Sequence, residues 1–241
     1  MSGQKKQRAL ITGASSGIGK ATVLAFAKAG VDVALISRSL DKLEPVADAA
    51  RHVGVEAKSY TLDLSEVTQI PAKISEVLAD FGEIDILVNN AGIGYTGMLR
   101  DTPLKDWQRV IDLNLTSVFQ TTLAILPGMR DRGRGTIINV SSIAGKQAFA
   151  NWGAYCVSKA GLMAFSQTLA QEERPHGIRV TAICPGAVNT EIWDTDTVEA
   201  NFDRTRMLTP EVVAESILYA ALLPPLAVID ELTIMPSAGV L

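Results

Sequence analysis

Short apolar runs alternate with helical patterns along this chain, and that alternation is what most constrains its fold. The first run covers residues 9–12 and ends in a glycine-rich turn, after which a helical pattern closes at Gly30. A strand over 31–36, a helix over 41–52 and a strand over 56–61 follow. Units of this kind fold with right-handed crossovers, which places their strands parallel in one sheet.

The same order continues through the second half of the chain. We predict helices over 66–81, 103–129, 151–171 and 210–223, and strands over 84–89, 135–141, 179–184 and 230–235. No linker and no internal repeat divides the 241 residues. The expected fold is therefore α/β: one domain over residues 1–241, with a doubly wound parallel sheet of about seven strands and helices on both faces.

Composition narrows the functional classes. Apolar residues make up 47% of the chain and charged residues 20%, so a large core can be buried. The net charge of -4 leaves no basic surface for nucleic acid. Cys156 and Cys184 lack metal-type spacing and the two histidines are isolated, so no metal site is expected. The apolar run 220–229 is too short for a membrane span, and we expect a cytoplasmic protein without a membrane partner.

Residues 12–19 read TGASSGIG, between the first strand and the first helix. A chain that turns sharply there, and lets a pyrophosphate approach the amides at a helix N-terminus, needs glycines where side chains would collide. The spacing differs from the G-x-G-x-x-G of many dehydrogenases, and a tight turn without a ligand is an alternative. The position of the motif favours a dinucleotide phosphate site.

The end of the second predicted strand bears on which dinucleotide binds. It reads ISRS over residues 36–39, with no acidic residue before Asp41. A carboxylate there would accept hydrogen bonds from the ribose hydroxyls of NAD, whereas the 2′-phosphate of NADP needs a cation. The sequence therefore favours NADP(H), with Arg38 as the phosphate partner and Lys42 as an alternative.

Tyr155 and Lys159 lie four residues apart in the predicted helix 151–171, so their side chains rise from one face. A cation about 4 Å from a phenol favours the phenolate by roughly 4 kcal/mol at an effective dielectric near 20. That interaction would lower a tyrosine pKa from about 10 towards about 7. Such a tyrosine can act as a general acid or base at neutral pH, although the pair alone also occurs on solvated helix edges.

Several motifs together share the order and spacing of one protein family. They are Thr12-Gly13 with Gly17-Ile18-Gly19, Asn89-Asn90-Ala91-Gly92, Asn114, Ser142, Tyr155-x-x-x-Lys159, and PGAVNT at 185–190. On these residues the chain resembles the compact short-chain dehydrogenases/reductases over nearly its whole length. The resemblance implies a Rossmann fold and hydride transfer between a nicotinamide and a carbonyl carbon.

The resemblance implies four catalytic residues. Ser142 would hydrogen-bond the substrate oxygen, and Tyr155 would exchange a proton with it. Lys159 would bind the nicotinamide ribose and lower the pKa of the tyrosine. Asn114 would interrupt its helix locally and hold a water that connects Lys159 with solvent. Ser141, although adjacent, does not match by spacing.

The resemblance also implies a cofactor set. Asp63 would contact the adenine amino group, the turn 90–92 would shape the cofactor floor, and Val188 and Thr190 would hold the carboxamide. The set expected for NADP(H) is Gly13, Ser15, Ser16, Gly17, Ile18, Gly19, Ser37, Arg38, Asp63, Leu64, Asn90, Ala91, Gly92, Tyr155, Lys159, Pro185, Gly186, Val188 and Thr190.

The substrate pocket is expected outside the carboxyl ends of the strands, among residues 94–98, 144–152 and 189–208. Its apolar and aromatic character suits a hydrophobic ketone or a β-keto ester, while Lys146 could attract a carboxylate. The candidates are Tyr95, Met98, Lys146, Gln147, Phe149, Trp152, Ile192, Trp193 and Phe202. For Phe202 we favour packing of the loop over substrate contact.

The expected function is that of an NADPH-dependent carbonyl reductase acting on a small-molecule ketone, β-keto ester or hydroxy acid. The alternatives are a 3-ketoacyl-carrier-protein reductase and a non-catalytic NADP-binding sensor. The ending IDELTIMP at 229–236 lacks the glycine-rich segment of the ketoacyl reductases. It resembles the branch of NADP-dependent 3-hydroxy acid and clavulanate dehydrogenases.

Assembly is predicted from two helices. The helix 103–129 carries apolar residues all round, more than one sheet-facing stripe requires. Small residues over 160–164 permit close approach of a neighbour. We expect a homotetramer, with a homodimer as the alternative.

Overall fold

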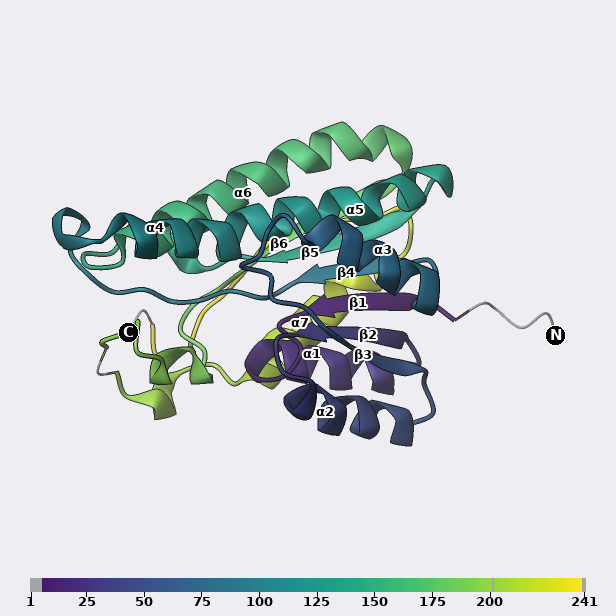
Figure 1. The fold of residues 1–241 in the computed structure, drawn as a ribbon, viewed down its shortest axis with the longest axis horizontal. Coiled ribbons are helices and arrows are strands. Elements are labelled where there is room, and N and C mark those ends of the chain that lie inside the picture. Colours follow the sequence, from purple (N-terminus) through teal and green to yellow (C-terminus); the bar gives the residue numbers. More distant parts are fainter. Residues whose placement is uncertain (1–5, 201, 240–241) are drawn as a thin grey trace.

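Seven parallel strands form one sheet in the middle of the computed structural model, which describes residues 6–200 and 202–239 (Figure 1). Their order is β3-β2-β1-β4-β5-β6-β7. The strands are β1 (Arg8–Thr12), β2 (Asp32–Ser37), β3 (Ala57–Thr61), β4 (Ile86–Asn89), β5 (Gly135–Val140), β6 (Ile178–Pro185) and β7 (Glu231–Ile234). The predicted doubly wound α/β fold is confirmed; the ends of the predicted domain, 1–5 and 240–241, lie outside the described residues.

Helices cover both faces of the sheet (Figure 1). On one face lie α1 (Gly17–Lys28), α2 (Leu40–His52) and α7 (Pro210–Ala221); on the other lie α3 (Ile70–Phe81), α4 (Leu104–Ile111), α5 (Ser117–Asp131) and α6 (Gly153–Glu173). Strands β2 and β4 are buried along their whole length because both of their faces are covered, and their polar residues stand only at their ends. All six residues of β2, for example, are buried.

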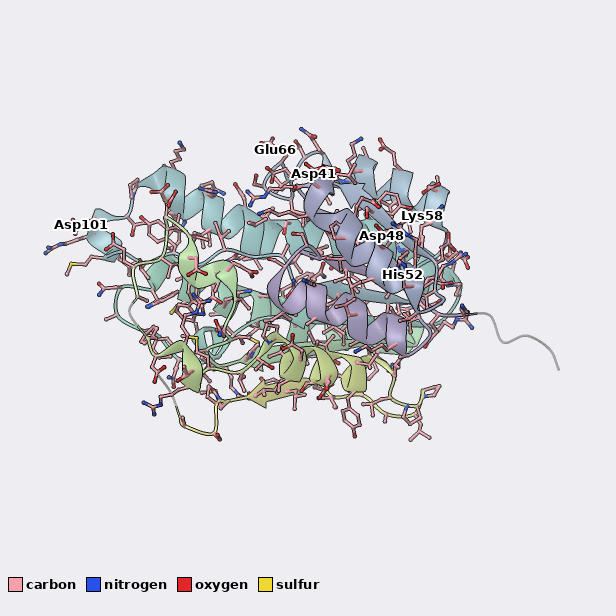
Figure 2. The ribbon with its side chains drawn as sticks, turned by 90° about the horizontal axis from the view of Figure 1, so that it is seen from below. Asp41, Asp48, His52, Lys58, Glu66 and Asp101 are labelled. Atoms are coloured by element: carbon pink, nitrogen blue, oxygen red, sulfur yellow. The ribbon has the colours of Figure 1, made fainter. Side chains whose placement is uncertain are left out.

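Helix α2 illustrates how the sequence pattern sets the packing. Its apolar residues, Leu43, Val46, Ala47 and Ala50, recur at helical spacing and are buried against the sheet. The labelled acids Asp41 and Asp48 lie along its outer side, with His52 at its last turn (Figure 2).

Two predicted helices differ from the observed ones by more than two residues at one end or in their internal structure. α3 begins at Ile70 rather than residue 66, with Pro71 in its first turn, where a missing amide costs no helical hydrogen bond. The predicted helix 103–129 contains a π-helical turn, η2 (Asp112–Thr116), between α4 and α5. Together α4, η2 and α5 form one continuous helix, Leu104–Asp131, that is long and apolar enough to span a bilayer. It packs on α3 and α6, however, as a core helix does.

The carboxyl ends of the strands face one side of the molecule, and the loops that follow them meet there (Figure 1). The loop after β4 bridges to the start of α6 through Gly97 and Trp152. The segment after β6 contains the short helices η5 (Glu191–Asp194) and η6 (Arg204–Arg206) and returns to pair Val188 with Leu208. This edge is where the predicted site residues gather.

Candidate active site

The turn between β1 and α1 brings backbone segments closer together than side chains would permit. Gly13 (φ 65°) and Gly17 (φ 49°) have left-handed conformations that favour glycine. A Cβ on Gly19 would overlap the carbonyl oxygen of Gly13. Within the described residues, the N-cap Ser16 makes no side-chain capping bond, so the first amides of α1 are left for another acceptor. These features fit a pyrophosphate.

Hydrogen bonds fasten the ends of β1 and β4 together behind this turn. Thr12 Oγ1 accepts from the amides of Asn90 and Ala91 at 3.0 and 3.1 Å. The side-chain amide of Asn90 donates to the carbonyls of Thr12 (3.0 Å) and Gly13 (3.3 Å). Thr12 is thus a positioning residue that the sequence-based set omitted. The sequence shows a hydroxyl residue at the end of the first strand. Its hydrogen-bond partners, however, become known only once β4 is paired with β1.

Arg38 and Asp63 lie near each other, after the ends of β2 and β3. Arg38 is exposed. Burial acts to raise the pKa of Asp63, but hydrogen bonds from the hydroxyl and amide of Ser65 to Oδ1, at 2.7 and 2.9 Å, outweigh it. The charges of Arg38 and Arg109 lower that pKa further. An ionised carboxylate and an exposed guanidinium close enough to lower its pKa therefore lie at the strand ends where an adenosine ribose is expected.

One cleft at this edge of the sheet gathers part of the predicted set. Its predicted members are Ile18, Asn90, Gly92, Ser142, Tyr155, Lys159, Pro185, Gly186, Val188 and Thr190. The remaining predicted residues lie outside its lining: Gly13, Ser15, Ser16, Gly17 and Gly19 in the glycine turn, Ser37, Arg38, Asp63 and Leu64 at the ends of β2 and β3, Ala91, and Asn114 in η2. The structure thus brings three of the four predicted catalytic side chains, Ser142, Tyr155 and Lys159, together in one cleft, while Asn114 lies outside its lining.

Ser142, Tyr155 and Lys159 meet in this cleft. Ser142 follows β5, accepts a hydrogen bond from the Ala144 amide at 3.1 Å, and lies close enough to the Tyr155 phenol to act on its pKa. Lys159 is buried, and its Nζ donates to the Val140 carbonyl at 2.9 Å. That nitrogen lies 5.8 Å from the centre of the Tyr155 ring.

The pKa of Tyr155 contradicts the sequence-based prediction. Burial raises it to about 12, although the hydrogen bond with Ser142 acts to lower it. Burial also lowers the pKa of Lys159 to about 8. The prediction assumed a cation about 4 Å from the phenol at an effective dielectric near 20. Here the ammonium group bonds the Val140 carbonyl, and loss of solvation dominates the pKa of the phenol. The expected lowering is therefore wrong for this structure, in which the phenol stays protonated at neutral pH.

Asn114 interrupts its helix, as predicted. It lies in the π-helical turn η2, fully buried. Its Oδ1 accepts from the Ile93 amide at 2.8 Å, and its Nδ2 donates to the Ile93 carbonyl and to Ser158 Oγ, both at 3.0 Å. A Cβ on Gly92 would lie 3.2 Å from Oδ1 and 3.6 Å from Lys159 Nζ, which places these groups together. The bridging water stays a prediction.

Two residues missed by the sequence reasoning dock α6 onto β5. Ser141 Oγ donates to the carbonyl of Lys159 at 3.1 Å. A Cβ on Gly145 would lie 2.7 Å from the same carbonyl oxygen, so only glycine permits this approach. Ser141 therefore positions the lysine backbone, which explains a second serine beside Ser142.

The part of the cleft that the sequence predicts for the substrate is lined mostly by apolar side chains. Of the sequence candidates, Phe149, Trp152, Ile192, Trp193 and Phe202 line it. Tyr95, Met98, Lys146 and Gln147 are not in its lining. Lys146 instead pairs with Glu231 at 2.5 Å and donates to Thr233 Oγ1 at 3.1 Å.

Comparisons with known proteins agree with this geometry. The sequence profile described as short chain dehydrogenase matches residues 7–200. A putative ketoacyl reductase of Streptomyces coelicolor is 36% identical over 239 residues, covering 91% of each chain. The glycine betaine reductase ATRR of Emericella nidulans is 34% identical over 234 residues, which cover 95% of this chain but only 18% of that protein.

A solved structure extends the likeness to three dimensions. The crystal structure of a metagenomic short-chain oxidoreductase in complex with NADP superposes with a TM-score of 0.84 at 34% identity. The match covers 96% of this chain and 97% of that one. Together with the seven-stranded sheet and the Ser142, Tyr155 and Lys159 cleft, these matches show that the chain belongs to the short-chain dehydrogenase family, enzymes acting on CH–OH or C=O groups.

Proposed function

We propose that the chain is an NADPH-dependent carbonyl reductase that converts a small-molecule ketone to an alcohol. The observation that carries this is the meeting of Ser142, Tyr155 and Lys159 in a cleft whose far wall is apolar. A hydroxyl, a protonated phenol and a cation in one place serve proton transfer to a carbonyl oxygen.

Three side chains of the cleft each act differently on that carbonyl oxygen. When bound, the reduced nicotinamide supplies the hydride that reaches the carbonyl carbon. Ser142 donates a hydrogen bond to the carbonyl oxygen, and Tyr155 gives it a proton as the C=O double bond becomes C–OH. Solvent then returns a proton to the phenol. Lys159, held by Val140, places a positive charge near the oxygen as negative charge develops there.

Preference for NADP over NAD rests on the end of β2. Arg38 is exposed at that point, and its charge lowers the pKa of Asp63. A guanidinium binds phosphate through charge-assisted hydrogen bonds. The solved relative in complex with NADP supports the same choice.

A carrier-protein substrate is the main alternative, and the Streptomyces coelicolor relative favours a ketoacyl compound of some kind. The sequence has one local cluster of arginines, Arg130, Arg132 and Arg134, at the end of α5, and at least two of them are engaged in ion pairs. Arg130 forms a two-pronged pair with buried Glu173, and Arg134 lies 3.7 Å from Asp85. These pairs weaken a role in recognising an acidic carrier. A non-catalytic sensor would have no use for the complete set of Ser142, Tyr155 and Lys159.

The outer faces of α5 and α6 support the proposed homotetramer. Phe119 and Leu123 on α5 and Val157 on α6 are each more than two-fifths exposed, and Ala160 beside them is exposed as well. A separate apolar group on α7 and the turn after it includes Tyr219 and Leu226. Two distinct apolar faces are what a tetramer with two interfaces needs. A monomeric mass by light scattering at micromolar protein would refute this, and the cytoplasm stays the predicted compartment.

A substrate panel tests the proposed reaction. The purified protein is given NADPH or NADH with neutral ketones, β-keto esters and, in the oxidative direction, hydroxy acids, and the absorbance of the reduced nicotinamide is followed. We expect turnover of neutral ketones with a clear preference for NADPH. Absence of turnover with every compound and both cofactors would overturn the assignment.

A further inference from the structure

Three aromatic side chains form a continuous row in the cleft that ends on Tyr155. The ring centres of Phe202 and Trp193 are 5.4 Å apart, those of Trp193 and Trp152 are 5.8 Å apart, and those of Trp152 and Tyr155 are 5.6 Å apart. All three contacts are edge-to-face, with interplanar angles of 67° to 84°. All four rings line the cleft. The row therefore leads from the rim of the cleft to the proton donor.

The row is assembled from two separate chain segments and is held by polar bonds behind it. The indole Nε1 of Trp193 donates to the Val188 carbonyl at 2.7 Å, so its one polar atom is already satisfied. Arg204 fixes the same loop by donating to Asn189 Oδ1 (2.7 Å) and to the Thr190 carbonyl (2.8 Å). A wall that is already ordered loses little conformational freedom when a ligand binds.

Charge in the cleft restricts the ligand further. Among the described residues that line the cleft, Lys159 alone bears a charge at neutral pH, and it is bonded to the Val140 carbonyl. Lys146, the sequence candidate for a carboxylate partner, is paired with Glu231 outside the lining. A carboxylate placed beside the aromatic row would lose its water without gaining a partner there.

We propose that the substrate is a neutral aryl ketone, whose ring packs among Trp152, Trp193 and Phe202 while its carbonyl oxygen meets Ser142 and Tyr155. Trp193 and Phe202 are then specificity-determining residues. An aromatic ring gains edge-to-face contacts in this row that a saturated ring of the same size does not. This inference rests on the proposed carbonyl reduction and narrows it to one class of ketone.

Matched ketones test the inference on the wild-type enzyme with NADPH. Acetophenone and cyclohexyl methyl ketone share a skeleton and differ in aromaticity; methyl 4-acetylbenzoate and 4-acetylbenzoate differ in charge. We expect kcat/KM for acetophenone to exceed that for the saturated ketone about tenfold or more. The ester should exceed the carboxylate by about a hundredfold. Equal values within either pair would overturn the proposal while leaving carbonyl reduction intact.

Variants then assign the selectivity to the row. Phe202→Leu, at a partly exposed position that does not threaten folding, should reduce the acetophenone preference about fivefold. Trp193→Leu should do the same, and Trp193→Phe should restore most of it by retaining a ring. Phe119→Leu, which removes an aromatic contact with Phe165 outside the cleft, should leave the preference unchanged.

The outcomes separate the two levels of the proposal. An unchanged preference in Phe202→Leu and Trp193→Leu would remove the row from substrate recognition. Reduction of aliphatic ketones alone would refute the aryl class but support the proposed function. No reduction of any ketone would refute both.

Discussion

Lys159 and Tyr155 share one face of α6, with the lysine nitrogen 5.8 Å from the centre of the tyrosine ring and bonded to the Val140 carbonyl. Burial moves their pKa values in opposite directions, to about 12 for the phenol and about 8 for the amine. At neutral pH the structure therefore holds a protonated phenol beside a charged ammonium group. That pairing suits donation of a proton to a substrate oxygen, the step that carbonyl reduction requires.

Replacing Tyr155 with Phe should abolish most of the reduction and spare cofactor binding. The phenol is the proton donor of the cleft, and loss of a general acid typically costs about 10²–10⁴-fold in rate. NADPH affinity, followed by its fluorescence, should change by less than about threefold because most of the expected cofactor contacts lie elsewhere. Tyr219→Phe, on the exposed side of α7, is the control. Retention of more than about a tenth of the wild-type rate would contradict the assigned role.

The depressed pKa of Lys159 predicts a specific pH dependence of stability. Its ordinary value is 10.5, and burial lowers it to about 8 in the folded chain. Between these values the unfolded lysine holds a proton that the folded one has lost, so the free energy of unfolding rises with pH in this window. The contribution should grow by about 1–2 kcal/mol from pH 8 to about pH 9.5.

Chemical denaturation of the wild type and of Lys159→Met measures this contribution. The difference between their free energies of unfolding should be flat from about pH 6 to about pH 7.5, below both pKa values, and then rise. Subtracting the variant cancels the other titrating groups. The raised pKa of Tyr155 acts only at higher pH, where it makes stability fall between about 10 and about 12. If the difference in the free energy of unfolding stayed flat up to about pH 9.5, the Lys159 amine would be solvated in the folded chain and its pKa would not be lowered.

The order of the elements was predictable because each carries its own local signal. Four consecutive residues of β2, Val33 to Ile36, are apolar and buried, and α2 repeats its buried positions at helical spacing. The glycine turn was predictable for a steric reason: backbone approaches backbone at Gly19. Spacing alone also placed Tyr155 and Lys159 on one helical face.

The remaining features depend on contacts between distant segments, which local pattern does not contain. Thr12 gains its role only when β4 lies beside β1. The direction of the Tyr155 pKa shift depends on how much water the folded cleft excludes. Lys146 lies outside the lining of the cleft because it forms an ion pair with Glu231, which stands on a strand near the C-terminus. Long-range pairing and burial thus decide the details of the site.

Replacing Arg38 with Ala should weaken NADPH much more than NADH. Arg38 is exposed at the end of β2, where the 2′-phosphate is expected, and loss of a charge-assisted contact with phosphate costs about ten- to a hundredfold in affinity. The KM for NADPH should rise accordingly while that for NADH changes less than about twofold. Lys42→Ala on α2 tests the alternative partner named from the sequence. An equal effect of Arg38→Ala on both cofactors, or a larger one from Lys42→Ala, would move the phosphate away from Arg38.

Replacing Gly19 with Ala should destabilise the fold by about 3 kcal/mol or more, because its Cβ would overlap the carbonyl oxygen of Gly13 where β1 turns into α1. Gly30→Ala is the matched control. That glycine has φ 80° but open space around its Cβ position, so its cost is limited to about 1–2 kcal/mol of backbone strain. The free energies of unfolding of the two variants, measured with urea, distinguish the steric overlap at Gly19 from the backbone strain at Gly30. Failure of Gly19→Ala to fold is the extreme form of the expected result. Equal stability of both variants would mean that the turn can move apart, in which case its glycines are not required by close approach.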